Sequence, residues 1–316
     1  MGGSLRATLA AVAARAQRKM DVGGPAKAPY APDQAHDVAY DPDLVPPPAL
    51  MRTEGIDVLE DWFRWAEEWS SILRIYGGLR SDSNVLEIGC GLGRTAFPLR
   101  YTLINGGTYD GFEIAADKVE FLRDRFESAY PNFRFKRADV YNTYYNPSGT
   151  VTADRYVFPY ADASFDVVYA ASVFTHMLPD GVAAYLRQSA RVLRANGRCV
   201  FSFFLLDHYR PGRPRPLGFA RPGFSFDHRL PGHDSDFAIG VLENPEEMCA
   251  YRLSLVERLA AEAGLKLARP ALPGMWSGAF DSWVGSQDVI VLERATGPAA
   301  GQARAAEVRP DDPVNP

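Results

Sequence analysis

Three alternating glycines follow a short apolar run, and the residues after them can start a helix. The segment reads Val85-Leu86-Glu87-Ile88-Gly89-Cys90-Gly91-Leu92-Gly93. An apolar run of this kind is typical of a central parallel strand. Glycine has no Cβ atom, so backbone N–H groups can approach a ligand closely, and a helix N-terminus favours polar or anionic groups. The spacing therefore predicts a loop that binds a cofactor.

Polar residues at the ends of three further expected strands could complete this site. Ligands of open α/β sheets bind at the carboxyl ends of the strands. Glu113 could accept hydrogen bonds from both hydroxyls of a ribose, and each charge-assisted bond contributes about 1.5–3 kcal/mol. Asp139 and the backbone N–H of Val140 could contact the edge of an adenine. Ser172 would lie beside the reactive end of the cofactor.

The glycine spacing separates two classes of cofactor. A dinucleotide fingerprint is G-x-G-x-x-G, whereas this loop is G-x-G-x-G. Together with acids at the ends of the second and third expected strands, the loop indicates an adenosine ligand without a pyrophosphate, which is S-adenosylmethionine. A nicotinamide-dependent oxidoreductase is the alternative enzyme class, and it predicts binding of NAD(P) instead.

Residues 84–205 resemble the class I S-adenosylmethionine-dependent methyltransferases. The glycine segment at 85–93 is similar to their first motif. Three further blocks carry the likeness, namely Tyr109-Asp110-Gly111-Phe112-Glu113-Ile114, Phe165-Asp166-Val167-Val168 and Arg191-Val192-Leu193-Arg194-Ala195-Asn196-Gly197. This chain has Glu87 where Asp is more common, which keeps the charge. It has Ala115 in place of a Ser or Thr cap, at a cost of about 1 kcal/mol to the helix.

The resemblance implies a cofactor role for eight residues: Glu87, Gly89, Gly91, Gly93, Glu113, Asp139, Val140 and Ser172. The glycines would shape the loop around the methionine moiety, and Glu87 would orient that moiety from below. Glu113 would hold the ribose and Asp139 the adenine amino group. Ser172 would lie near the methionine amino end.

His176 follows the fourth expected strand and is the candidate general base. Alignment of the reactants can supply about 7–11 kcal/mol of the barrier reduction in methyl transfer. A base is needed only when the acceptor must lose a proton, and it then adds roughly 10²–10⁴-fold. An unperturbed imidazole titrates near pH ~6.5, which suits that role. Alternatively, His176 braces its loop or lines the cofactor pocket.

Alternating strands and helices must position these residues. The pattern predicts an α/β fold with a parallel sheet and helices on both faces. In the resembling family this is a Rossmann-like, seven-stranded, three-layer sandwich whose last strand is antiparallel. The expected strands are 84–88, 108–113, 133–135, 165–172, 198–205, 265–269 and 286–292. The expected helices are 55–76, 93–104, 115–129, 178–193 and 245–263.

The chain divides into three expected parts. Residues 1–50 would form a helix over 4–19 and then a lead-in whose many prolines prevent regular structure. Residues 51–294 would form the methyltransferase domain, and 295–316 a disordered tail. The inserted loop 206–244 could be a lid over the acceptor, with its arginines meeting an anionic group, or a flexible solvated loop. The Tyr-rich loop 141–160 could form the opposite wall or pack at an edge.

Composition limits the partners that we expect. The net charge of −5 and the pI of about 5.6 leave no electrostatic footprint for nucleic acid. The block Ser172-Val173-Phe174-Thr175 also lacks the Asx-Pro-Pro-aromatic sequence found in methyltransferases that act on nucleic-acid bases. No apolar run approaches the ~18 residues of a membrane span. We therefore expect a small-molecule acceptor, such as a sugar or secondary metabolite methylated on oxygen or nitrogen.

The cysteines and histidines indicate no metal site. Three cysteines without CxxC spacing favour a reducing, cytoplasmic setting. The spacing of His208, His228 and His233 matches no metal motif. Besides the oxidoreductase, a methyltransferase-like module that binds the cofactor without turnover is the alternative function. The sequence leaves the oligomeric state open.

Overall fold

The computed structural model describes residues 41–143, 145–211, 225–230 and 235–295. The chain separates into two compact units, residues 1–45 and 46–316. Within the described part of the first unit, a short 3-10 helix spans Pro42–Leu44. The second unit holds all of the elements described below. The helix expected at 4–19, most of the lead-in and nearly all of the expected tail lie outside the described residues.

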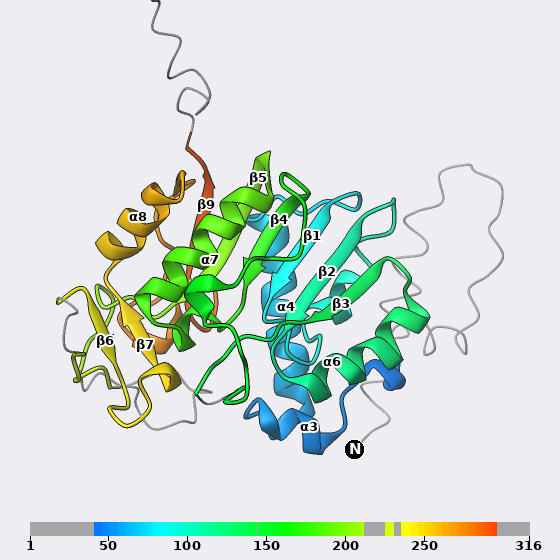
Figure 1. Ribbon diagram of the computed structural model, residues 1–316, viewed down its shortest axis with the longest axis horizontal. Helices are drawn as coiled ribbons and strands as arrows, with labels where there is room; N and C mark the ends of the chain where they lie inside the picture. The colour runs from blue at the N-terminus through cyan, green and yellow to red at the C-terminus, as the bar shows by residue number, and fades with distance from the viewer. Residues whose placement is uncertain (1–40, 144, 212–224, 231–234, 296–316) are drawn as a thin grey trace, which may run out of the picture. The chain divides into compact units, whose positions relative to one another are not determined.

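A seven-stranded sheet with the order β3-β2-β1-β4-β5-β9-β8 forms the centre of the second unit (Figure 1). β1 to β5 run parallel to one another, and β9 is antiparallel to both β5 and β8. The mostly parallel, Rossmann-like sheet with an antiparallel last strand is thereby confirmed. Its strands are β1 (Asn84–Ile88), β2 (Thr108–Glu113), β3 (Phe133–Arg137), β4 (Phe165–Ala170), β5 (Leu193–Phe203), β8 (Leu265–Leu267) and β9 (Asp288–Arg294).

The strand order reverses at β1. This strand pairs with β2 on one side and β4 on the other, and Val85 lies opposite both Tyr109 and Val167. All three strands point the same way, so their carboxyl ends meet at one edge of the sheet. That edge is the topological switch point, where open α/β sheets bind ligands. The glycine loop leaves β1 at this point.

Helices cover both faces of the sheet, as predicted. The helices are α3 (Pro48–Thr53), α4 (Leu59–Ile75), α5 (Ala96–Leu99), α6 (Ala116–Leu122), α7 (Pro179–Val192) and α8 (Leu253–Glu262). Successive strand residues point to opposite faces. Val168 of β4 belongs to the core cluster that holds Leu186 of α7, whereas Tyr169 stacks on Trp69 of α4 at 5.8 Å between ring centroids. α4 and α7 therefore lie on opposite faces (Figure 1).

Two expected helices differ from the structure near prolines. The helix expected at 93–104 is reduced to α5, because Pro98 has no N–H for the carbonyl of Arg94. Conversely, α3 begins inside the run Pro46-Pro47-Pro48, so the expectation of irregular structure is wrong for residues 48–50. Pro48 occupies the first helical position, where the missing N–H costs nothing.

The region after β5 departs most from the prediction. β6 (Phe237–Ile239) and β7 (Cys249–Tyr251) pair as a small antiparallel sheet, so residues 206–244 are not all loop. The helix expected from residue 245 begins only at Leu253. Phe237 packs on Tyr251 at 5.0 Å between ring centroids, and both side chains lie in the main core. Each of these strands is only three residues long, too short for a recognisable alternation of apolar and polar residues. Among the described helices, none is long and apolar enough to cross a membrane.

Candidate active site

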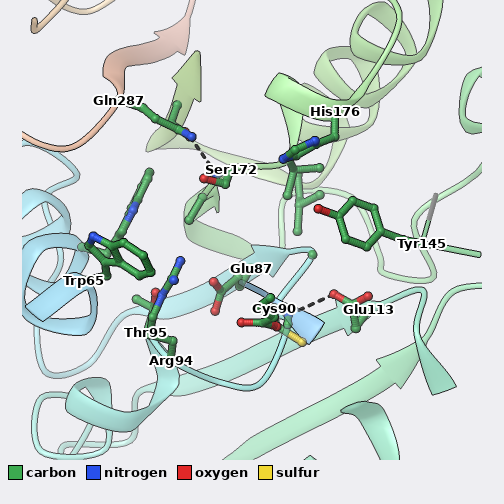
Figure 2. Close-up of a pocket in the computed structure, with 18 of the residues that line it drawn as sticks. Trp65, Glu87, Cys90, Arg94, Thr95, Glu113, Tyr145, Ser172, His176 and Gln287 are labelled. Carbon is green, nitrogen blue, oxygen red and sulfur yellow. Dashed lines mark hydrogen bonds between the residues drawn. The ribbon is translucent and has the colours of Figure 1, made fainter. Parts of the chain in front are cut away.

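A cavity of about 1080 Å³ opens at the carboxyl ends of β1, β2 and β4 (Figure 2). Ligand pockets typically measure roughly 300–1,000 Å³, so there is room for more than one small ligand. The glycine loop and the ends of β1 and β2 form its floor. The walls come from α4, the loop after β4, the segments 140–142, 246–248 and 283–289, and Tyr145.

The glycines of the loop have two different roles. Gly91 has a φ of +51° and lines the cavity, as Gly89 does. A Cβ atom at Gly91 would overlap the carboxylate of Glu54. Gly93 has a φ of +73°, and its missing Cβ leaves space for the side chain of Leu122 on α6. Gly93 is not among the residues that line the cavity, so its glycine serves the packing of loop against helix.

Glu87 lies buried on the cavity floor (Figure 2). Oε2 accepts hydrogen bonds from the hydroxyl of Tyr169 at 2.6 Å and from the hydroxyl of Tyr109. Burial raises the pKa of Glu87 to about 8, although both tyrosine bonds and the nearby Arg94 oppose that shift. The carboxyl group is therefore largely protonated at pH 7, and a cation placed beside it would favour its ionised form.

Glu113 ends β2 with its carboxylate turned toward the glycine loop. Oε2 accepts a hydrogen bond from the N–H of Gly91 at 3.0 Å. Oε1 accepts from the N–H groups of Ile114 and Ala115 at 2.8 and 2.9 Å. Glu113 thus binds the backbone at the start of α6, where Ala115 offers no side-chain cap. The acid and the glycine loop meet in one site, as the sequence predicts.

The two residues expected at the adenine differ in position. Val140 is buried and lines the cavity. Asp139 is exposed, its carboxylate accepts a hydrogen bond from the hydroxyl of Thr150, and it is not among the lining residues. The geometry therefore gives no support to an adenine contact by Asp139. Tyr141 and Asn142, the next residues along the chain, line the cavity instead.

Ser172 lines the cavity just beyond β4. Its φ of +57° lies in the left-handed region, and Ala163 is the other non-glycine residue there in the part of the chain that the structure describes. The N–H of Ser172 donates to Oγ of Ser202 at 2.8 Å. A non-glycine residue in this region costs about 1–3 kcal/mol and is often found at functional sites. The hydrogen bond with Ser202 stabilises this backbone conformation of Ser172 at the cavity.

His176 lies on a 3-10 helix, Phe174–His176, in the cavity wall. Its ring meets the ring of Tyr145 edge-on at 5.5 Å between centroids (Figure 2). Burial lowers the pKa of His176, although hydrogen bonding with the backbone of Glu247 and Glu246 opposes the shift. Nδ1 is buried and makes no hydrogen bond with any described residue. A neutral imidazole with an unused nitrogen at a ligand cavity can accept a proton.

The Tyr-rich loop 141–160 contributes both to the wall of the cavity and to packing at an edge, the two roles that the sequence left open. Tyr141 and Tyr145 line the cavity. Tyr156 packs on Phe112 at 5.6 Å, and Tyr160 packs edge-on against Phe165 at 5.2 Å between ring centroids. The first part of the loop is therefore a wall of the site, and the second part packs against the core.

Several lining residues were not singled out from the sequence. Trp65 and Glu68 come from α4, for which the sequence predicted a helix but no site residue. The guanidinium of Arg94 lies 5.1 Å from the centre of the Trp65 ring. The position of Arg94 directly after the glycine loop was the available signal. Glu54, Glu246 and Glu247 come from segments whose approach to the cavity no local pattern indicates.

The described polar residues after β5 form no metal site. No group of three or more His, Cys, Asp or Glu among the described residues could hold a metal ion. His208 Nδ1 lies 2.8 Å from Oδ1 of the buried Asp288, and His233 lies outside the described residues. Arg210 and Arg229 donate to backbone carbonyl groups, so neither is directed at an anionic ligand. Arg213, Arg215 and Arg221 also lie outside the described residues.

Known proteins resemble the part of the chain that forms this site. Residues 85–197 match the family described as "Methyltransferase domain". The 27-O-demethylrifamycin SV methyltransferase of Amycolatopsis mediterranei is 39% identical over 130 residues, which cover 40% of this chain and 41% of the relative. O-methyltransferase cnsE of Penicillium expansum is 31% identical over 139 residues, 42% of this chain and 41% of the relative. The matched regions thus span less than half of either relative.

A solved structure is also similar. The CcbJ methyltransferase from Streptomyces caelestis shares 18% sequence identity, with a TM-score of 0.46, over 82% of this chain and 94% of that one.

Proposed function

We propose that this chain transfers a methyl group from S-adenosylmethionine to a small-molecule acceptor, because residues 85–197 match the methyltransferase domain and form the glycine loop and its neighbouring strands. The observation that carries the proposal is the hydrogen bond of 3.0 Å between the Gly91 N–H and Glu113 Oε2. It brings the glycine loop and the acid after β2 into one cavity at the switch point of the sheet. That is where an adenosine cofactor of this fold is bound.

The cavity residues fit this cofactor. Glu113 would hold the ribose, Gly89 and Gly91 would lie against the methionine moiety, and Glu87 would face it from the floor. Val140 would contact the adenine, and Ser172 would lie near the amino end of the methionine moiety. Gly93 would let the loop pack against Leu122. Asp139 contributes least to this assignment, because its carboxylate is exposed and bound to Thr150. The cofactor's sulfonium supplies a methyl group that is already activated for in-line displacement.

The chain's own contribution to the reaction is alignment and proton removal. The walls of the cavity would hold the acceptor atom in line with the methyl group, and alignment can supply about 7–11 kcal/mol. His176 would accept the proton that the acceptor's O–H or N–H releases. Its lowered pKa keeps the imidazole neutral at pH 7, so the ring can receive a proton.

We propose a secondary-metabolite type of acceptor, methylated on oxygen or nitrogen. The two relatives are described as a methyltransferase of 27-O-demethylrifamycin SV and as an O-methyltransferase. The cavity walls beyond the glycine loop include Trp65, Phe204, Met275 and Trp283, which suit an acceptor with apolar surface. The acidic composition favours such an acceptor over nucleic acid. The three unpaired, buried cysteines favour a cytoplasmic setting.

Titration calorimetry with S-adenosylmethionine and S-adenosylhomocysteine tests the cofactor. We expect micromolar affinity for both, and folded protein that binds neither would overturn the proposal. An oxidoreductase would bind NAD(P) in place of these ligands.

A screen of metabolite classes tests the reaction by measuring release of S-adenosylhomocysteine. We expect acceptor-dependent release with at least one class of hydroxyl or amine compound. Binding of the cofactor without turnover on any acceptor would instead identify a binding module.

A further inference from the structure

Glu113, the expected ribose ligand, can accept few hydrogen bonds beyond those that it already accepts. An ionised carboxylate offers about four lone-pair sites. Three are taken by the N–H groups of Gly91, Ile114 and Ala115, two on Oε1 and one on Oε2. A ribose held by two hydroxyl donors needs two acceptor sites. Glu113 as it stands can accept from only one of them, so the second hydroxyl needs another partner.

Glu54 is a second carboxylate beside the glycine loop that could accept this hydroxyl. It follows the short helix α3 and lines the same cavity, and its Oε1 occupies the space that a Cβ atom at Gly91 would fill. Gly91 therefore touches both acids, donating its N–H to Glu113 and leaving room for Glu54. Oε1 is buried, and its close partner among the described residues is the ammonium of Lys118, so the carboxylate keeps unused lone-pair sites.

Lys118 forms an ion pair with this second acid. Its Nζ lies 3.1 Å from Oε1 of Glu54, and the two side chains are only 7% and 15% exposed. Burial lowers the pKa of Lys118, but the charges of Glu54 and Glu113 outweigh it, so the pKa is raised above its usual range. The ammonium group also lies 5.8 Å from the centre of the Tyr145 ring. The ion pair therefore holds the carboxylate of Glu54 beside the glycine loop.

We propose that Glu54 is a second ribose-binding carboxylate, which accepts one ribose hydroxyl of the cofactor while Glu113 accepts the other. Lys118 positions Glu54 through their ion pair. The inference rests on the proposed function, because it assumes an adenosine cofactor in this cavity. It extends the cofactor site to the segment before α4, which lies outside residues 85–197.

Calorimetry with three ligands tests the proposal. The ligands are S-adenosylhomocysteine and its analogues that lack the 2′-hydroxyl or the 3′-hydroxyl. We expect Glu54→Ala to weaken binding of S-adenosylhomocysteine about tenfold or more, the size of a lost charge-assisted hydrogen bond. For the analogue that lacks the hydroxyl bound by Glu54, the same variant should weaken binding less than about threefold. Only a direct contact predicts this dependence on one hydroxyl.

Asp57→Ala is the matched control, because Asp57 lines the same cavity from the same segment but is exposed. It should change the affinity for all three ligands less than about threefold. If Glu54→Ala does not fold, Glu54→Gln should show a smaller loss with the same dependence on the hydroxyl. Equal weakening of all three ligands, or no weakening of any, would overturn the role of Glu54. Wild-type protein that binds none of them would overturn the proposed function instead.

Discussion

Glu68 holds Ser286 by both of its carboxylate oxygens, across 218 residues of sequence. Oε1 accepts from the backbone N–H of Ser286 at 2.9 Å, and Oε2 accepts from its hydroxyl at 2.7 Å. This pair fastens the segment before β9 to α4. Both Glu68 and Ser286 line the cavity, together with their neighbours Trp65, Trp283 and Gln287. The wall that we propose to contact the acceptor is therefore attached to α4 through one carboxylate.

Replacing Glu68 by Ala should loosen that wall. The free energy of unfolding should fall by about 1–3 kcal/mol, because the bonds to Ser286 are lost in a largely buried place. The KM for the acceptor should rise while the affinity for S-adenosylhomocysteine changes less than about threefold. Chemical denaturation, steady-state kinetics and calorimetry measure the three quantities. Ser286→Ala should show the same pattern more weakly, since the backbone bond remains. If the affinity for S-adenosylhomocysteine falls as much as the KM for the acceptor rises, this wall does not contact the acceptor alone.

Replacing Glu113 by Ala should weaken cofactor binding about 10–100-fold, because its charge-assisted hydrogen bond to the ribose is lost. The variant also loses three bonds to the backbone of the glycine loop and α6, so its folding must be checked by circular dichroism. Asp139→Ala is the comparison, with an expected change below about threefold. A wild-type affinity in the Glu113 variant would remove this residue from the site.

Cofactor affinity should depend on pH through Glu87. With a pKa of about 8 the carboxyl group is mostly protonated at pH 7, and it becomes anionic as the pH rises through that value. The anion attracts the sulfonium, so S-adenosylmethionine should bind more tightly at pH 8.5 than at pH 6.5. A pKa lowered by one unit on binding corresponds to about tenfold in affinity. Calorimetry at several pH values measures this slope.

Two controls isolate the charge of Glu87. Glu87→Gln should flatten the dependence, because the amide does not ionise. The uncharged thioether of S-adenosylhomocysteine should show a smaller slope than the sulfonium. Equal slopes for both ligands, or a slope that persists in the Gln variant, would assign the pH dependence to another group.

His176 should set the acidic limb of the rate profile. Burial lowers its pKa, so the imidazole remains neutral down to a pH below its usual value near ~6.5 and becomes protonated only under more acidic conditions. The kcat of wild-type enzyme should therefore fall only below about pH 6.5. His176→Asn should lower kcat by roughly 10²-fold or more and remove that limb, with little change in cofactor affinity. Near wild-type turnover in the Asn variant would leave His176 with a bracing role.

Gly93 and Gly264 separate backbone strain from side-chain crowding. Their φ values are +73° and +76°, but a Cβ atom meets Leu122 at Gly93 and nothing at Gly264. Ala at Gly264 should cost about 1–2 kcal/mol of stability from strain alone. Ala at Gly93 should cost at least about 1 kcal/mol more, because Leu122 must move. Thermal denaturation of the two variants measures the difference, and equal losses would contradict the packing role of Gly93.

The parallel part of the sheet was predictable because each strand carries its own local signal. Apolar runs, glycine turns and amphipathic helices repeat from residue 84 to residue 205. The position of Glu113 beside the glycine loop follows from that pattern and from the rule that parallel strands end at one edge. The sequence also indicated His176 and Ser172 in the loop after β4, and both line the cavity.

What the sequence missed depends on contacts between distant segments. The pairing of β6 with β7 places Glu246 and Glu247 at the cavity, although their own sequence reads as the start of a helix. Glu54, at the end of α3, approaches Gly91 through a contact between segments that are far apart in the sequence. The exposed position of Asp139 depends on its bond with Thr150, in a loop whose path periodicity does not specify.

The thiol of Cys90 can report on the opening of the glycine loop. It is buried at the cavity between Gly89 and Gly91, and burial raises its pKa well above the usual range, so it stays protonated and slow to react. An alkylating reagent can reach it only when the loop opens. Cys199 and Cys249 lie deeper, with no exposed surface. The rate at which Cys90 is alkylated therefore measures how often the glycine loop opens. A bound cofactor should lower this rate.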